Sequence, residues 1–130
     1  MLSSDEFSRW MGLTILSLGD GSCSLRMHVR GEMANGFGIA HGAIMFALAD
    51  SAMAFAANNG EQVVVTLSNA ISYSVAVDVG DELVASVARQ SRSGRTETYT
   101  ATVVRNNTDT VAVLVGVTSR TKTNHDHGSS

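Results

Sequence analysis

Residues 43–59 read AIMFALADSAMAFAANN and carry the most informative pattern of the chain. From residue 43 to residue 57, 13 of 15 residues are apolar, and the two exceptions are Asp50 and Ser51. Ala, Leu and Met favour helix, and a helix that is apolar on all sides must be enclosed by protein. Fifteen helical residues span about 22 Å, too short for a bilayer but long enough to cross a small sheet. The stop signal Asn58-Asn59-Gly60 predicts the end of this helix.

The flanking sequence predicts one short helix and six strands. Residues 3–12 have the pattern of an amphipathic helix, which Ser3 or Ser4 would cap. Val, Thr and Tyr are frequent after Gly60, and residues 23–29 alternate apolar and polar side chains, as half-buried strands do. The order of elements predicts an α+β protein in which an antiparallel sheet packs against one buried helix. The predicted strands are residues 13–18, 23–29, 62–73, 81–90, 95–105 and 110–121.

A chain of 130 residues has the size of one domain, so we expect a single domain over residues 1–130. Residues 122–130 are polar and predict a flexible tail. His125 and His127 lie in this tail, and we expect them to be unstructured rather than metal ligands.

Composition argues against several classes of function. The net charge is −3 and the isoelectric point about 5.7, so a broad basic surface for nucleic acid is not expected. The single cysteine, Cys23, can form neither an internal disulfide nor a cysteine-pair zinc site. The first residues lack the pattern of a signal peptide, and no apolar stretch has the length of a membrane span. We therefore expect a cytoplasmic protein with no membrane partner.

Asp50 is the first candidate for a functional side chain. A carboxylate in the middle of an apolar helix costs free energy unless it is paired, hydrogen-bonded or neutralised. Such a residue is either a catalytic base or nucleophile, or a structural Asp that hydrogen-bonds a neighbouring loop. The residue type and its position leave both interpretations open.

The start of the same helix offers further candidate groups. The first backbone N–H groups of a helix have no internal acceptor and lie at its positive end. Because Gly42 has no side chain, a ligand oxygen can approach its N–H closely, and a one-donor oxyanion hole is possible. The alternative is that Gly42 only permits a tight turn. Asn35 can likewise bind the same oxygen through its amide or belong simply to an Asn-Gly turn.

The spacing of Gly42 and Asp50 has a geometric consequence. The two residues are eight positions apart, which corresponds to about 12 Å along one helix. Reacting groups must approach to about 3 Å, so one carbonyl cannot touch both residues of one chain. If both act on one substrate, they must come from different chains. Two such helices packed antiparallel across a two-fold axis would bring each Asp50 near the partner's Gly42 and place the site at a homodimer interface.

Short motifs in this region resemble those of hotdog-fold acyl-CoA thioesterases, most closely the phenylacetic-acid-degradation type, which is related to 4-hydroxybenzoyl-CoA thioesterases. That family has an Asn, six residues later a His-Gly-Gly, and an acidic residue eight positions after the first Gly, and the same spacings occur here. The resemblance covers most of residues 10–121. The matching motifs are Met33-Ala34-Asn35-Gly36, His41-Gly42-Ala43, Leu48-Ala49-Asp50, Tyr73, Gly80-Asp81-Glu82-Leu83 and Arg92-Ser93-Gly94-Arg95.

The resemblance implies a role for each matching residue. The Gly42 N–H would polarise the thioester carbonyl with the help of Asn35, and His41 would orient Asn35 or lie near the sulfur. Asp50 of the partner chain would act as nucleophile or as general base for water. A hydroxyl on the strand after the helix often holds that water, and Thr66 aligns with it, or Ser68 after a slip of the alignment. The residues implied in substrate binding are Arg92, Gly94, Arg95, Phe46 and Tyr73.

Two positions depart from the family pattern. Ala43 replaces the second Gly, which keeps the backbone N–H but makes the helix start less flexible. Ser74-Val75-Ala76 follows Tyr73, where the family often has Pro, and this weakens assignment to one substrate subgroup.

The resemblance implies a hotdog fold, an antiparallel sheet wrapped around one long helix, and hydrolysis of a small or medium, aromatic or short-chain, acyl-CoA. No metal or cofactor is expected beyond the coenzyme A of the substrate, and homodimers that pair into homotetramers are usual. A hydratase or dehydratase of acyl thioesters, with His41 as acid or base, is one alternative. A non-catalytic acyl-CoA-binding domain is the other.

Overall fold

The computed structural model describes residues 5–125 of the chain. Both predicted helices and all six predicted strands are present, and the strand ends lie within three residues of the predicted ones. The elements are α1 (Glu6–Met11), β1 (Thr14–Gly19), β2 (Ser22–His28), a 3-10 turn (Gly31–Met33), α2 (Gly42–Ala57), β3 (Gln62–Tyr73), β4 (Glu82–Ser93), β5 (Thr96–Arg105) and β6 (Asp109–Asn124).

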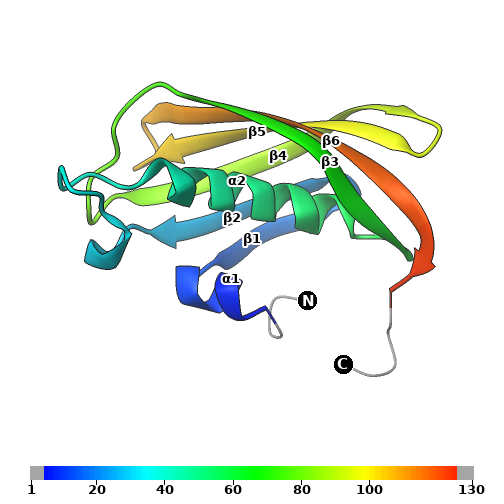
Figure 1. Ribbon diagram of the computed structural model, residues 1–130, viewed down its shortest axis with the longest axis horizontal. Coiled ribbons are helices and arrows are strands. Elements are labelled where there is room, and N and C mark those ends of the chain that lie inside the picture. The colour runs from blue at the N-terminus through cyan, green and yellow to red at the C-terminus, as the bar shows by residue number, and fades with distance from the viewer. Residues whose placement is uncertain (1–4, 126–130) are drawn as a thin grey trace.

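The six strands form one antiparallel sheet in the order β1-β2-β4-β5-β6-β3. Figure 1 shows the sheet curving around α2, with the small helix α1 near the β1 end of the sheet. A curved antiparallel sheet around one long helix is the α+β arrangement that the sequence predicts, and it is that of a hotdog fold. The strand β3 follows α2 directly in the chain but forms the edge of the sheet beside β6.

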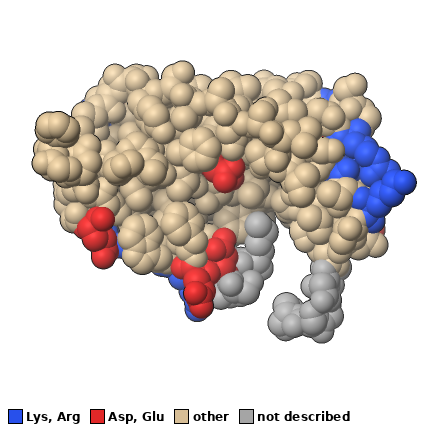
Figure 2. All heavy atoms as spheres, viewed as in Figure 1, with Lys and Arg blue, Asp and Glu red and all other residues tan. Residues whose placement is uncertain are grey.

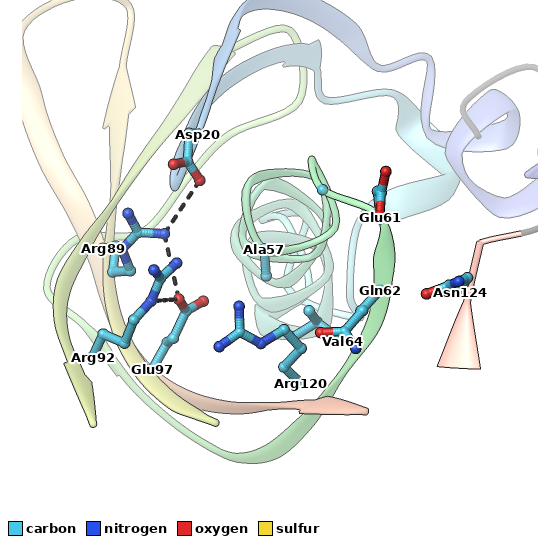
Figure 3. Close-up of a pocket in the computed structure, with 11 residues that line it drawn as sticks. Asp20, Ala57, Glu61, Gln62, Val64, Arg89, Arg92, Glu97, Arg120 and Asn124 are labelled. Carbon is cyan, nitrogen blue, oxygen red and sulfur yellow. Dashed lines mark hydrogen bonds and ion pairs between the residues drawn. The ribbon is translucent and has the colours of Figure 1, made fainter. Parts of the chain in front are cut away.

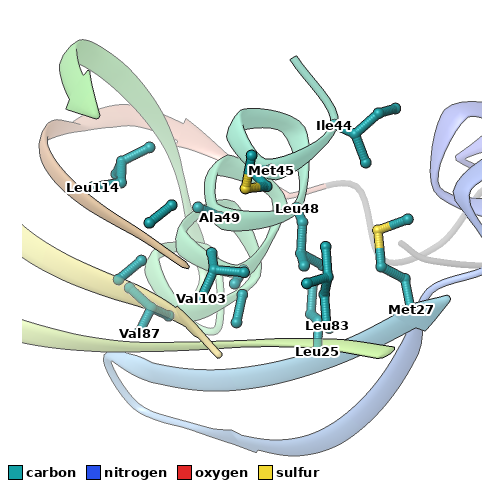
Figure 4. Packing of buried hydrophobic residues seen from close by; sticks show 14 of the residues in the cluster. Leu25, Met27, Ile44, Met45, Leu48, Ala49, Leu83, Val87, Val103 and Leu114 are labelled. Carbon is teal, nitrogen blue, oxygen red and sulfur yellow. The ribbon is translucent and has the colours of Figure 1, made fainter. Parts of the chain in front are cut away.

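The core lies between α2 and the concave face of the sheet (Figure 4). Leu48 of α2 is fully buried, as are Leu25 of β2 and Leu83 of β4 on the sheet. Burial of each such side chain stabilises the fold by about 1.5–3 kcal/mol, so this helix face fixes α2 in place. The face of α2 that points away from the sheet is covered less completely, because Phe46, Asp50 and other residues of this helix are only half-buried in one chain.

The structure corrects two details of the sequence interpretation. The N-cap of α1 is Asp5, whose carboxylate accepts hydrogen bonds from the backbone and hydroxyl of Ser8, whereas Ser3 and Ser4 lie outside the described residues. Residues 122–124, expected in a flexible tail, belong to β6, and Asn124 pairs with Gln62 at the start of β3. The Thr121 hydroxyl donates to the Val63 carbonyl at 2.7 Å and helps to hold this end of the strand. His125, expected to be unstructured, donates its backbone N–H to the Glu61 carbonyl at 2.7 Å, whereas His127 and the other residues of 126–130 lie outside the described part.

In residues 5–125, no helix has both the length and the apolar character needed to span a membrane.

Candidate functional site

The start of α2 presents one free backbone amide. His41 is the N-cap, and its Nδ1 accepts a hydrogen bond from the Ala43 N–H at 3.2 Å. The Gly42 N–H lies in the first turn, where the helix provides no acceptor, and no hydrogen bond among the described residues uses it. Gly42 is therefore the available donor for an oxyanion, since the Ala43 amide is already occupied.

Tyr73, predicted to bind substrate, packs against Gly42. Its hydroxyl donates to the Gly42 carbonyl at 3.0 Å, and this bond ties the end of β3 to the start of α2. A Cβ at position 42 would lie 3.3 Å from the Tyr73 ring, so the missing side chain permits this close packing. Gly42 therefore has a packing role, and this role is compatible with a catalytic role for its N–H.

Asn35 lies in a loop that folds back on itself beside the helix start. Its Oδ1 accepts hydrogen bonds from the backbone of Phe37 at 2.9 Å and of Ile39 at 3.4 Å. The His41 N–H donates to the Met33 carbonyl, so the two arms of the loop lie side by side. With Oδ1 engaged in the loop, the Nδ2 group of Asn35 has no acceptor within residues 5–125 and is available as a donor. His41 and Asn35 share no hydrogen bond.

Asp50 lies in the middle of α2 and is the only charged residue of that helix. One carboxylate oxygen, Oδ1, accepts a hydrogen bond at 2.9 Å from Nδ2 of Asn69 on β3. The other oxygen, Oδ2, has no hydrogen-bond partner within residues 5–125. The carboxylate is thus held on one side and free on the other, as a base or nucleophile requires.

A cleft of about 310 Å³ opens beside Asp50. Its walls are mostly apolar, and Phe7 shows that α1 contributes to it. The lining residues are Asp5, Phe7, Phe46, Ala47, Asp50, Ser51, Ala54 and Phe55. Figure 2 shows that the face crossed by α2 carries few charged side chains. This face therefore suits an uncharged group.

The hydroxyls predicted near the water lie on opposite sides of the sheet. Thr66 pairs with Thr118, which is buried, so it is on the face towards α2. The register of β3 shifts between Thr66 and Ser68, and Ser68 pairs with Val117 on the face away from α2. The next residue, Asn69, contacts Asp50. Both hydroxyl residues are exposed and make no side-chain hydrogen bond among the described residues.

The predicted phosphate-binding turn joins β4 and β5. Gly94 has a φ of +62°, a backbone conformation that favours glycine at this turn. Nε of Arg92 lies 2.5 Å from Oε2 of the buried Glu97, and Arg95 donates to the Arg120 carbonyl at 3.4 Å. Figure 3 shows Arg92 and Glu97 in a polar pocket of about 310 Å³ near the end of α2, with the Arg120 guanidinium pointing into it.

Glu97 is an ionised group despite its burial. Burial alone would raise its pKa, but hydrogen bonds from Tyr99 and Arg92 and the charges of Arg92 and Arg89 outweigh it and lower the pKa. The same surroundings raise the pKa of Tyr99 to about 12, through burial first and the Glu97 carboxylate second. Arg92 is therefore an anchored cation rather than a freely moving one.

The structure brings some predicted residues together and keeps others apart. His41, Gly42, Tyr73 and the loop of Asn35 meet at one end of α2, whereas Arg92 lies towards the other end. Gly42 and Asp50 of one chain remain eight helical positions apart. Sequence reasoning missed Asn69 and the contribution of α1 to the cleft. No cluster of three or more potential metal-ligating side chains occurs in residues 5–125.

These features define a hotdog-fold protein with a carboxylate at mid-helix and a free amide at the helix start. The chain belongs to the thioesterase superfamily, whose family model matches residues 37–113, more than half of the chain. Membership in this family confirms the predicted class of enzyme, a thioester hydrolase.

Individual relatives agree with this assignment. Acyl-coenzyme A thioesterase PaaI of Escherichia coli is 29% identical over 120 residues, which make up 92% of this chain and 86% of that protein. The structure of the E. coli PaaI protein from the phenylacetic acid degradation operon matches with a TM-score of 0.92 at 28% identity, covering 95% of this chain and 90% of that one. TT0310 from Thermus thermophilus matches with a TM-score of 0.84 at 34% identity, covering 90% and 98%.

Proposed function

We propose that this protein hydrolyses an acyl-CoA thioester to a free acid and coenzyme A. The observation that carries the proposal is the half-buried Asp50, which has one oxygen held by Asn69 and the other free beside an apolar cleft. The similarity to the acyl-coenzyme A thioesterase PaaI supports the choice of thioester.

In the proposed reaction, the Gly42 N–H and the Asn35 amide bind the thioester oxygen as it gains negative charge. Asp50 removes a proton from a water molecule, whose oxygen bonds to the carbonyl carbon, and the carbon–sulfur bond then breaks. The thiolate of coenzyme A leaves and takes up a proton. Direct attack by Asp50, followed by hydrolysis of the resulting anhydride, gives the same products. One oxyanion donor contributes about 3–4 kcal/mol to such catalysis.

We further propose that each site is shared between two copies of the chain. About 12 Å of helix separates Gly42 from Asp50 within one chain, so the partner copy must supply one of them. The half-buried outer stripe of α2 and the edge strand β3 support a homodimer. Val65 and Leu67 of β3 are 45% and 61% exposed, which leaves apolar surface for a second copy. Pairs of such dimers would form a tetramer.

The cleft beside Asp50 suits a small or medium apolar acyl group, aromatic or short-chain. An engineered apolar cavity of about 150 Å³ holds one benzene molecule, so 310 Å³ accommodates a single ring and its linker. Phe46, Phe7 and Phe55 line this cleft, and aromatic side chains suit an apolar or aromatic group. We assign the phosphates of coenzyme A to Arg92 and Arg95 at the Gly94 turn, since guanidinium groups suit phosphate oxygens.

The hydratase alternative has less support. It needs a histidine acid or base paired with an acidic residue near the acyl β-carbon, whereas the side-chain hydrogen bond of His41 is with the Ala43 backbone and not with a carboxylate. A purely binding domain would give no reason for a mid-helix carboxylate with one free oxygen.

The first test is release of coenzyme A from a panel of acyl-CoAs, followed with DTNB. We expect turnover by the native chain and a loss of at least about 100-fold in Asp50→Asn, because the positioned base is lost. Cys23 does not disturb this assay, because burial raises the pKa of its thiol to about 11. Near-normal turnover in Asp50→Asn would remove Asp50 from the mechanism. Binding without turnover across the panel would instead support the binding domain.

A further inference from the structure

The contact between Asn69 and Asp50 joins two elements that are far apart in the sequence. Asp50 lies on α2 and Asn69 on β3, and the hydrogen bond between them measures 2.9 Å. Because a carboxylate only accepts, the NH₂ group of Asn69 must face Asp50. The Oδ1 atom of Asn69 is then turned into the interior, where it is buried and has no hydrogen-bond partner among the described residues.

A buried acceptor without a partner costs free energy, because it loses its hydrogen bonds to water. A side chain that served only packing would place an apolar residue at position 69 and avoid this cost. The orphan Oδ1 is the consequence of turning the NH₂ group towards Asp50. The arrangement therefore indicates a role for the donor at Asp50 that outweighs the unmet acceptor.

Gly116 of β6 provides the space for this arrangement. Asn69 and Gly116 are cross-strand partners, and a Cβ on Gly116 would lie 2.6 Å from Oδ1 of Asn69 and would also collide with the sulfur of Met53. Gly116 does not have a positive φ, so its backbone could carry another residue. Glycine inside a strand weakens it, and here the missing side chain is needed for room rather than for backbone freedom.

We infer that Asn69, given room by Gly116, is a positioning residue for Asp50. It holds one carboxylate oxygen and thereby directs the other towards the cleft. Asn69 is absent from the residues that line the cleft, so it acts on the reaction through Asp50 and makes no contact with the acyl group. This inference rests on the proposed catalytic role of Asp50.

Asn69→Leu, which keeps the approximate shape but not the donor, tests the inference in single-turnover and steady-state assays. We expect kcat to fall about 10- to 100-fold, as for loss of a charge-assisted hydrogen bond, with KM changed by less than about 3-fold. Ser72→Ala, on the same strand but on its opposite face, is the matched control and should retain kcat within about 2-fold.

A double-mutant cycle with Asp50→Asn separates positioning from a structural effect. If Asn69 acts through Asp50, then Asn69→Leu should change the residual single-turnover rate of Asp50→Asn by less than about 2-fold. An equal loss in both backgrounds, or an unchanged kcat in the native background, would overturn the inference while leaving the proposed function intact. A native rate in Asp50→Asn itself would instead overturn the proposed function.

Gly116→Ala tests the same arrangement if Asn69→Leu does not fold. The added methyl group meets the ends of two side chains, Met53 and Asn69, which can move without rebuilding the strand. We expect a folded protein, checked by circular dichroism, with kcat lowered because the Asn69 amide is displaced. Full kcat in folded Gly116→Ala would contradict the inference.

Discussion

At the scale of single residues, the proposed chemistry depends on the backbone N–H of Gly42. Gly42 has two properties that only glycine combines: its amide is open to a ligand, and its missing side chain admits the Tyr73 ring. A side-chain substitution at position 42 therefore changes packing as well as access. A test of the N–H therefore compares a variant that removes it with one that adds a Cβ at the same place and keeps it.

Gly42→Pro removes this donor at the helix position where proline is best tolerated. His41 has φ −62° and ψ 137°, the extended conformation that a residue before proline prefers. We expect kcat/KM for an acyl-CoA to fall about 100-fold or more, because the oxyanion loses its backbone donor.

Gly42→Ala is the matched control, since it adds a Cβ against Tyr73 but keeps the N–H. It should lose clearly less activity than Gly42→Pro. Equal losses in the two variants would show that packing against Tyr73, and not the amide, explains the glycine.

At the scale of elements, the sequence was sufficient for α2 and the strands, because their signals are local. A run of Ala, Leu and Met predicts the helix. Alternating apolar and polar residues, together with turn residues, predict the strands. The sequence predicts Ser3 or Ser4 as the cap of α1, whereas the cap is Asp5. It also predicts too short a β6, because the last residues of this strand are polar and are held by pairing with β3. Asn69 could not be predicted, since its role depends on its register with Gly116 and on its contact with Asp50, 19 residues earlier in the chain.

The β4–β5 hairpin supplies a prediction about acid stability. The folded-state pKa of Glu97 lies below its ordinary value because of Tyr99, Arg92 and Arg89. A carboxyl group of this kind stabilises the fold at pH values above its unfolded pKa of about 4.5, and this contribution is lost as the pH falls through the lower folded pKa. Glu97→Gln should therefore lower Tm at pH 7 and show a shallower loss of Tm below about pH 4.5.

Thermal unfolding between pH 3 and pH 7 checks this expectation. Glu6→Gln, at an exposed position of α1, is the control and should follow the native curve. A native Tm for Glu97→Gln at pH 7, with an unchanged acid slope, would show that the Arg92 and Tyr99 contacts add nothing to stability.

At the scale of the whole molecule, the proposed site exists only when two chains meet. One chain holds its donor at the start of α2 and its carboxylate two turns later, beside a cleft that α1 helps to wall. A half-buried helix stripe and an exposed apolar edge strand fit this requirement. Arg92, held by Glu97 near the far end of α2, is the residue to which we assign the phosphates of coenzyme A.

Subunit complementation between Asp50→Asn and Gly42→Pro chains tests whether two chains share each site. Each variant alone should be nearly inactive towards an acyl-CoA. After the two are unfolded together and refolded in equal amounts, half of the dimers should be mixed, and each mixed dimer should contain one intact site of two. Recovered turnover of about one quarter of the native value is therefore expected. No recovery, with mixed dimers demonstrated by differently tagged chains, would contradict the shared site.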